Sequence, residues 1–234
     1  AIAHSLVEMD PDVSVLIISG SPIIGSFDFR TRVDFVRVPG VIKLRNGDYT
    51  SLSLHMDVED TVNLRSSIIN HTAEAFDPDL FIVDKEPLGL RGEVRDTLLM
   101  LKERGTPRVL GLRDVMDEPA ALAPEWERKK VLPALRDLYD EIWVYGREEI
   151  CDPLEGLDIP ASVRSKMRYT GYLRREASNA PAPKPNIPFA DDAFLLVTAG
   201  GGGDGEAVMD WVLRAYEHDS ELPYPALLVL GPFM

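Results

Sequence analysis

Short apolar runs alternate with longer amphipathic segments along most of the chain. Runs rich in Val, Ile and Leu predict strands that are buried on both faces, and the segments between them predict helices. The predicted strands lie at 13–19, 33–38, 80–84, 108–112, 141–145 and 167–171. The predicted helices lie at 1–9, 57–76, 92–104 and 125–139. Because the connections are too long for hairpins, the pattern predicts parallel βαβ units and an α/β fold.

A proline-rich segment, REASNAPAPKPNIPFADD at 175–192, interrupts this alternation. A strand at 194–199, a helix near 205–217 and a strand at 226–231 follow it. We therefore expect two Rossmann-like domains with parallel sheets, at 1–172 and 193–234, joined by a linker at 173–192. Three elements cannot enclose a core, so we expect the second domain to be incomplete.

Composition narrows the classes of partner and compartment. The formal net charge is −14, which argues against nucleic acid as a partner because non-specific binding depends on Lys and Arg at phosphates. No run reaches the roughly 18 apolar residues that span a bilayer. The single cysteine excludes an internal disulfide framework and suits a reducing compartment, so we expect a cytoplasmic protein.

The sequence LLVTAGGGGDGEAVMDW begins at Leu195 and carries the strongest chemical motif. Gly200, Gly202 and Gly205 fit the spacing G-x-G-x-x-G between a strand and a helix. Bare backbone N–H groups and a helix N-terminus favour a bound phosphate. The next strand ends in LLVLGPFM without the acidic residue of a dinucleotide site, and no Lys-Ser or Lys-Thr follows the glycines. A turn that uses glycines only for packing or flexibility is the alternative.

Two Asp-Pro-Asp triplets, at 10–12 and 77–79, allow two interpretations. Paired carboxylates hold a divalent cation in many sugar transferases, but Asp-Pro is also a common way to end a helix. Both triplets precede strands, whereas open parallel sheets bind ligands beyond the carboxyl ends of their strands. The four histidines are scattered, so we predict no metal site.

Ionisable residues follow three successive strands, where the sheet edge would form a cleft. Asp84, Tyr145 and Glu148 lie at such ends. The candidates for an acceptor-side cleft are Ser19, Gly20, Lys85, Glu86, Arg113 and Asp114. For each of them the alternative is a structural role, as a solvent-exposed loop residue or a helix cap.

The sequence of the loop at 39–56 predicts either a hairpin turning at Asn46-Gly47 or a contact with a membrane surface.

The segment MRYTGYLRR at 167–175, the VTAGGGGDG motif and the two predicted halves resemble bacterial glycosyltransferases of the GT-B fold. The likeness is to relatives of the N-acetylglucosaminyltransferase that makes lipid II, of the family 28 type. In that family the first domain binds an acceptor and the second holds a nucleotide sugar, usually UDP-linked. The resemblance implies that Gly200, Gly201, Gly202, Gly203 and Gly205 lie near the donor diphosphate.

The same resemblance implies a function. We expect an enzyme that transfers a sugar from a nucleoside diphosphate to an acceptor hydroxyl in envelope or polysaccharide synthesis, of the inverting type, without metal or other cofactor. The partners would be a nucleotide-sugar donor and a glycan or lipid-linked acceptor, with peripheral contact at the inner face of the membrane. In that family a first strand and a loop with the candidate catalytic base precede a helix like 1–9. We therefore expect the first domain to lack its opening strand, and no base is assigned. A nucleotide-sugar epimerase and a non-catalytic nucleotide- or sugar-binding regulator are the alternatives.

Overall fold

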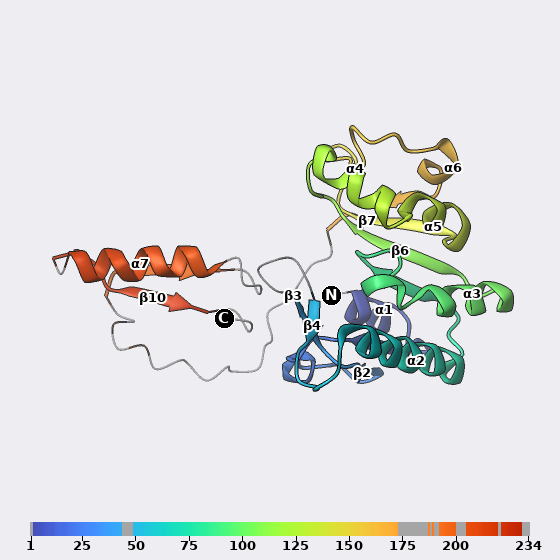
Figure 1. Ribbon diagram of the computed structural model, residues 1–234, viewed down its shortest axis with the longest axis horizontal. Helices are drawn as coiled ribbons and strands as arrows, with labels where there is room; N and C mark the ends of the chain where they lie inside the picture. Colours follow the sequence, from blue (N-terminus) through green and yellow to red (C-terminus); the bar gives the residue numbers. More distant parts are fainter. Residues whose placement is uncertain are drawn as a thin grey trace. The chain divides into compact units, whose positions relative to one another are not determined.

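A computed structural model describes residues 2–43, 49–172, 187, 189, 192–199, 205–219 and 221–230 (Figure 1). The chain forms two compact units, Ala1–Arg175 and Glu176–Met234. Most of the proline-rich segment lies outside the described residues, so the linker at 173–192 stays a prediction.

Two parallel sheets form the first unit and confirm the predicted α/β class. The larger sheet has four parallel strands in chain order: β5 (Phe81–Asp84), β6 (Arg108–Arg113), β7 (Glu141–Tyr145) and β8 (Met167–Tyr169). The smaller one pairs β1 (Val15–Ser19) with β2 (Val33–Arg37). A short antiparallel hairpin joins β3 (Val41–Lys43) to β4 (Tyr49–Ser51). The pairing confirms the hairpin interpretation of this loop, while its predicted turn, Asn46-Gly47, lies outside the described residues.

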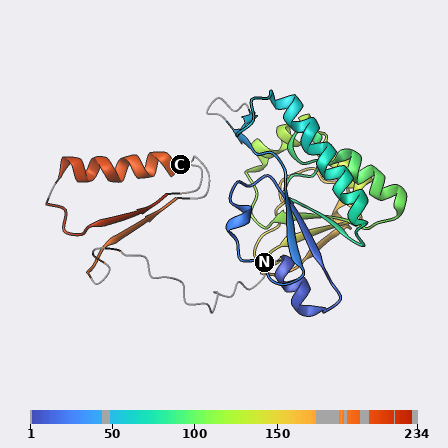
Figure 2. The same ribbon diagram turned by 90° about the horizontal axis from the view of Figure 1, so that it is seen from below.

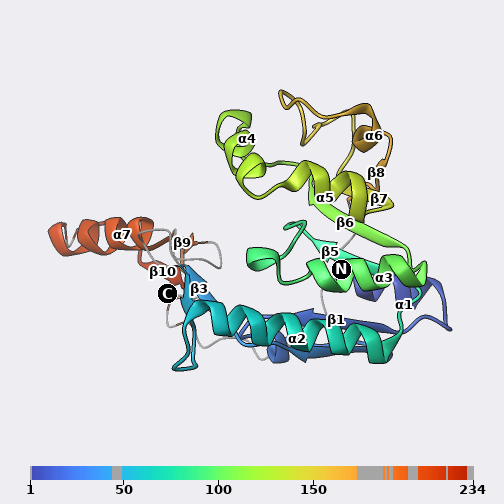
Figure 3. The same ribbon diagram turned by 45° about the vertical axis from the view of Figure 1, so that its right-hand side comes forward.

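Helices connect the strands and cover the sheets. In chain order they are α1 (Ile2–Met9), α2 (Val58–Phe76), α3 (Arg95–Arg104), α4 (Pro119–Arg128), α5 (Val131–Leu138) and α6 (Ala161–Arg164), with 3-10 turns η1 (Ile24–Ser26) and η2 (Leu90–Gly92). In Figure 2, α1 and α2 lie on opposite sides of β1 and β2. Figure 3 shows α2 and α3 running side by side, as their contacts require.

The prediction of one helix over 125–139 is wrong. Two helices occupy 119–128 and 131–138, and they are separated at Lys130, whose φ is +54°. A residue in this left-handed conformation cannot continue a right-handed helix, so the hydrogen-bond ladder stops. Each helix then turns its own apolar residues, including Trp126 of α4 and Leu135 of α5, into the core.

The core of the first unit lies between the four-stranded sheet and its helices. Leu98 of α3, Leu110 and Leu112 of β6, and Ile142 of β7 have no exposed surface. Trp126 is 7% exposed and packs in the same cluster. Burial of these side chains fixes the strand register that positions the polar residues at the strand ends.

The two Asp-Pro-Asp triplets have structural roles. Asp10 follows α1, and its carboxylate accepts a hydrogen bond from the backbone N–H of Asp12 at 2.9 Å. Asp77 adopts a left-handed conformation after α2, and its N–H donates to the carbonyl of Ala73. Both triplets therefore end helices, as the alternative to a cation site predicts.

A buried ion pair connects the loops of both sheets in the first unit. Arg65 of α2 donates to the two carboxylate oxygens of Glu93 at 2.5 and 2.7 Å, and both side chains are less than a tenth exposed. Its third donor group reaches the carbonyl of Pro39, after β2, at 2.6 Å. A Cβ at Gly20, after β1, would lie 2.5 Å from the same guanidinium. Glu93 also accepts the N–H of Leu90.

The second unit contains one parallel pair and one helix. β9 (Leu195–Thr198) pairs in parallel with β10 (Ala226–Val229), and α7 (Glu206–His218) connects them. The Tyr216 hydroxyl donates to the carbonyl of Tyr224, which attaches the helix to the segment before β10. Within the described part of the chain, no helix has the length and apolarity to span a bilayer.

Glu93→Gln should destabilise the first unit by about 3 kcal/mol or more, because it leaves the Arg65 charge buried without a counter-ion. Urea unfolding of the purified protein measures this loss. Asp137→Asn is the control, since the Arg136–Asp137 pair at 2.8 Å is exposed to solvent and its loss should change the stability little. A loss below about 1 kcal/mol in Glu93→Gln would contradict the proposed role of the pair.

Candidate functional site

The polar residues that follow β5, β6, β7 and β8 form the candidate site. All four strands are parallel, so their carboxyl ends meet at one edge of the sheet. Ligands of open parallel sheets bind at this edge. The structure places Asp84 at the end of β5 and Lys85 directly after it, Arg113 at the end of β6, and Tyr145 at the end of β7. We call these four residues the edge cluster.

Gly111 makes the edge cluster possible. It pairs with Asp84 on β5 on one side and with Trp143 on β7 on the other. A Cβ at Gly111 would lie 1.7 Å from the hydroxyl oxygen of Tyr145 and 2.4 Å from its Cζ. The ring of Tyr145 therefore crosses β6 through the space that a side chain would occupy. The hydroxyl is thereby brought from β7 to the side of Asp84.

Asp84 is the carboxylate of the edge cluster, and its pKa is raised. Its side chain is exposed at the strand end, but the surrounding protein removes enough water from the carboxyl group to raise its pKa. Arg113, Lys85 and the Tyr145 hydroxyl act in the opposite direction without cancelling this effect. The charged form of Asp84 is thus disfavoured in the fold, while two cations remain near it.

The Tyr145 hydroxyl is buried and has no hydrogen-bond partner among the residues that the structure describes. Burial raises the pKa of this phenol, and the neighbouring Asp84 carboxylate raises it further. Hydrogen bonding with Asp84 also raises the pKa of Tyr145 and lowers that of Asp84, although the hydroxyl lies outside strict hydrogen-bond geometry. A buried hydroxyl without a partner carries a desolvation cost that a bound hydroxyl, anion or water would remove.

Two of the predicted acceptor-side residues are held by protein partners. Glu86 forms a salt bridge with Lys129, after α4, at 2.9 Å. Asp114 accepts a hydrogen bond from the Tyr172 hydroxyl at 2.6 Å, and its Cβ lies where a side chain at Gly146 would be. Both residues lie at the predicted edge, and their contacts fix the loops rather than leave a carboxylate open.

A hollow of about 330 Å³ lies at the same edge, between the loops after β7 and β8. It is lined by Gly146, Arg147, Glu148, Glu149, Tyr169, Thr170 and Gly171. Backbone hydrogen bonds connect its two sides, from Thr170 to Val144 and from Gly171 to Gly146, each at 2.9 Å. The positive φ of Gly171, +71°, is required where the chain turns away from β8.

Ser19 and Gly20 belong to the smaller sheet. The Ser19 hydroxyl accepts the N–H of Ser21 at 3.1 Å, and its carbonyl accepts the N–H of Val38 at 3.0 Å. Gly20 packs against the Arg65 guanidinium. Both residues lie at a strand end, as predicted, but their contacts are structural.

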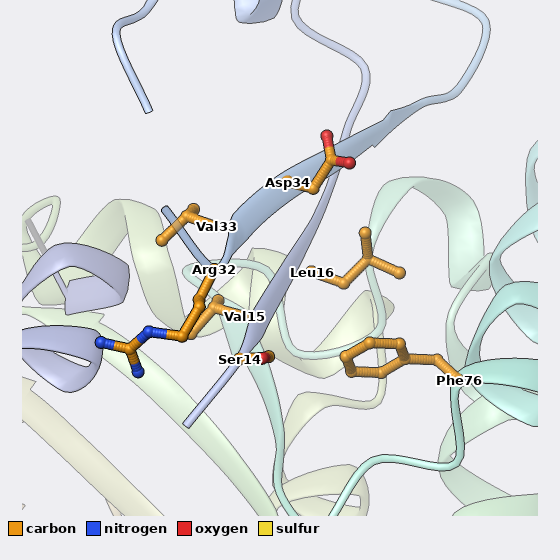
Figure 4. A pocket seen from close by; sticks show the side chains of 7 residues that line it. All are labelled: Ser14, Val15, Leu16, Arg32, Val33, Asp34 and Phe76. Carbon is orange, nitrogen blue, oxygen red and sulfur yellow. The ribbon is translucent and has the colours of Figure 1, made fainter. Parts of the chain in front are cut away.

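A second hollow of about 330 Å³ lies at the opposite strand ends, around the start of β1 and β2 (Figure 4). In the close-up, the Arg32 side chain points away from Leu16 and Phe76. Arg32 donates to the carbonyls of Val7, Asp10 and Val13. This hollow is at the amino ends of parallel strands, and its one cation secures a turn, so we do not place the functional site there.

The predicted donor loop is described only in part. Gly200, Gly201, Gly202 and Gly203 lie outside the described residues, and Gly205 is the buried residue immediately before α7. Its φ and ψ of −81° and −12° are accessible to any residue, so Gly205 is not needed for its backbone angles. The segment begins after β9 and ends at a helix N-terminus, which is the setting that a phosphate-binding glycine loop requires.

The described residues contain no group of three or more His, Cys, Asp or Glu side chains placed to hold a metal ion.

Sequence reasoning identified the strand ends but did not identify Gly111 as the residue that admits Tyr145. A glycine inside an apolar strand is the signal that could have found it, because such a glycine often marks a close approach of another group.

Comparisons with known proteins identify no family. No protein-family model matches the chain, and no curated protein matches it in sequence. Among solved structures, it resembles a Listeria monocytogenes protein provisionally named a UDP-N-acetylglucosamine 2-epimerase, with a TM-score of 0.48 and 11% identity. The likeness covers 98% of this chain and 57% of that protein.

Gly111→Ala should destabilise the protein by about 1–3 kcal/mol, because the new methyl group displaces the Tyr145 ring. Urea unfolding measures the loss, and Gly25→Ala serves as the control, since its Cβ would lie 3.6 Å from Phe35 in ordinary contact. Combining Gly111→Ala with Tyr145→Leu should recover part of the loss. If the two substitutions are additive, Tyr145 does not occupy the space above Gly111.

Proposed function

We propose that the protein is a nucleotide-sugar enzyme, and that it transfers the sugar from a nucleoside diphosphate to an acceptor hydroxyl. The observation that carries the proposal is the parallel unit formed by β9, α7 and β10, with the glycine-rich segment between β9 and α7. A glycine segment between a parallel strand and a helix N-terminus presents backbone N–H groups to a phosphate.

The N-terminus of α7 suits a diphosphate in particular. The first N–H groups of a helix have no partner inside it, and the aligned peptide dipoles give this end a partial positive charge. Gly205 offers no side chain to cap these groups. A diphosphate leaving group gains negative charge as the glycosyl bond breaks, and fixed N–H donors stabilise that charge without a metal.

The first unit supplies features suited to an acceptor. The edge cluster combines a carboxylate, a buried hydroxyl and the cations Lys85 and Arg113. Acceptor hydroxyls need a proton acceptor, and phosphate-bearing acceptors need cations. The hollow between the loops after β7 and β8 lies at the same sheet edge and offers room for a sugar ring. We propose this edge as the acceptor side.

A matched pair of substitutions at Gly205 tests the donor site. Aspartate and asparagine are both good residues at a helix start and have nearly the same size, so they differ only in charge. Gly205→Asp should weaken the binding of a nucleoside diphosphate at least tenfold relative to Gly205→Asn, because the carboxylate repels the diphosphate. Calorimetric titration of the full-length protein with UDP, GDP, CDP and dTDP measures the difference. Equal affinities of the two variants, or no binding to the parent protein, would refute the proposed donor site.

The products separate the proposal from its alternatives. Transfer to a glycan or lipid-linked acceptor, with release of the nucleoside diphosphate, supports the glycosyltransferase. Conversion of the sugar to its epimer without an acceptor identifies a nucleotide-sugar epimerase. Saturable binding without turnover identifies a regulator. NMR of the reaction mixture distinguishes these three results.

A further inference from the structure

Asp84 differs from the other two carboxylates that follow β5 and β6. Glu86 is held by Lys129, and Asp114 is held by Tyr172. Within the described part of the chain, no cation forms a salt bridge with Asp84, and the Tyr145 hydroxyl is the side-chain donor whose hydrogen bonding lowers the pKa of its carboxyl group. Asp84 therefore lies, without a counter-ion bound to it, at the edge where parallel sheets bind ligands.

The groups that face Asp84 come from β6, from β7 and from the loop after β5. Arg113 approaches from the end of β6, Tyr145 from the end of β7 across Gly111, and Lys85 from the adjacent position of its own loop. The two cations favour the ionised carboxylate, whereas desolvation opposes it and is the larger effect. The result is a carboxylate that accepts a proton more readily than an ordinary aspartate does.

Tyr145 gives the carboxylate a neighbour suited to a hydroxyl ligand. Its O–H is buried without a partner and lies beside Asp84. A bound alcohol can donate its own hydrogen to the carboxylate and accept one from the phenol, which satisfies the polar groups left open in the structure. The neighbouring cations stabilise the negative charge that develops on the alcohol oxygen as it loses its proton.

We propose that Asp84 is the proton acceptor for the acceptor hydroxyl, with Tyr145 positioning that hydroxyl; this rests on the proposed glycosyl transfer. In the step, the acceptor oxygen forms a bond to the anomeric carbon, and the proton of the hydroxyl moves to an Asp84 carboxylate oxygen. The bond from the anomeric carbon to the diphosphate oxygen breaks, and its electron pair leaves with the diphosphate.

The closing experiment compares Asp84→Asn with Asp79→Asn in the full-length protein, using the nucleotide sugar and acceptor that the parent protein consumes. Asp79 is exposed and precedes β5, at the opposite end of the same strand. Asp84→Asn should lower kcat at least 100-fold with little change in KM, because proton transfer contributes roughly 10²–10⁴-fold. Asp79→Asn should leave both constants within about twofold of the parent values.

The pH profile distinguishes proton transfer from a structural role. The acid limb of kcat/KM in the parent protein should lie above the ordinary aspartate value of 3.8, and it should be absent in Asp84→Asn. Arg113→Gln should move that limb to higher pH, because it removes a cation that holds the proton off Asp84. Circular dichroism at each pH checks that the variants stay folded.

The outcomes are distinct for the two proposals. Transfer by the parent protein with kcat of Asp84→Asn within threefold of the parent overturns the role of Asp84 alone, as does an acid limb that survives the substitution. Absence of transfer in the parent protein overturns the proposed function and this role together. Loss of kcat and of the acid limb in Asp84→Asn, with Asp79→Asn unchanged, supports both.

Discussion

The arrangement of the first unit depends on one buried ion pair, between Arg65 of α2 and Glu93. A single guanidinium contacts the loops that follow β1 and β2, while its carboxylate partner also receives the N–H of Leu90 in the segment after β5. These loops leave the carboxyl ends of strands in both sheets. Such a pair is costly to desolvate and stabilises the fold little more than an apolar contact would. Removing one partner, however, leaves the other charge buried without a counter-ion. Its value is therefore in fixing where the loops lie, which is the condition for a defined site at this edge.

The edge cluster shows how a site can depend on the absence of a side chain. Gly111 leaves space for the Tyr145 ring, and the ring brings a hydroxyl across one strand to Asp84. The arrangement has an energetic cost, since a phenol is buried without a partner and a carboxylate is desolvated. The fold binds the Asp84 proton more tightly than the unfolded chain does. The free energy of unfolding therefore falls as the pH rises from the ordinary aspartate pKa of 3.8 through the raised pKa of Asp84. Costs of this kind are typical of functional sites, where stability is given up for chemistry.

The sequence allowed most strands to be predicted, because β-branched runs at regular intervals are a strong signal. The predicted strand at 141–145 matches β7 residue for residue. The error at 125–139 arose because a left-handed Lys130 leaves no trace in an apolar periodicity. The strand ends were predicted as the site, but the partners there were not. Glu86 meets Lys129 from 43 residues away, and Tyr172 meets Asp114 from 58 residues away. Such pairs follow from sheet register and loop path, which local patterns do not specify.

The central claim is that the fold prepares Asp84 to accept a proton. Carboxyl carbon NMR titration of the folded protein, with the Asp84 signal assigned by its loss in Asp84→Asn, measures this most directly. The account predicts a midpoint above 3.8, and a still higher midpoint in Tyr145→Phe, because the phenol lowers the pKa of the carboxyl group. A midpoint at or below 3.8, or one that Tyr145→Phe leaves in place, would contradict the account.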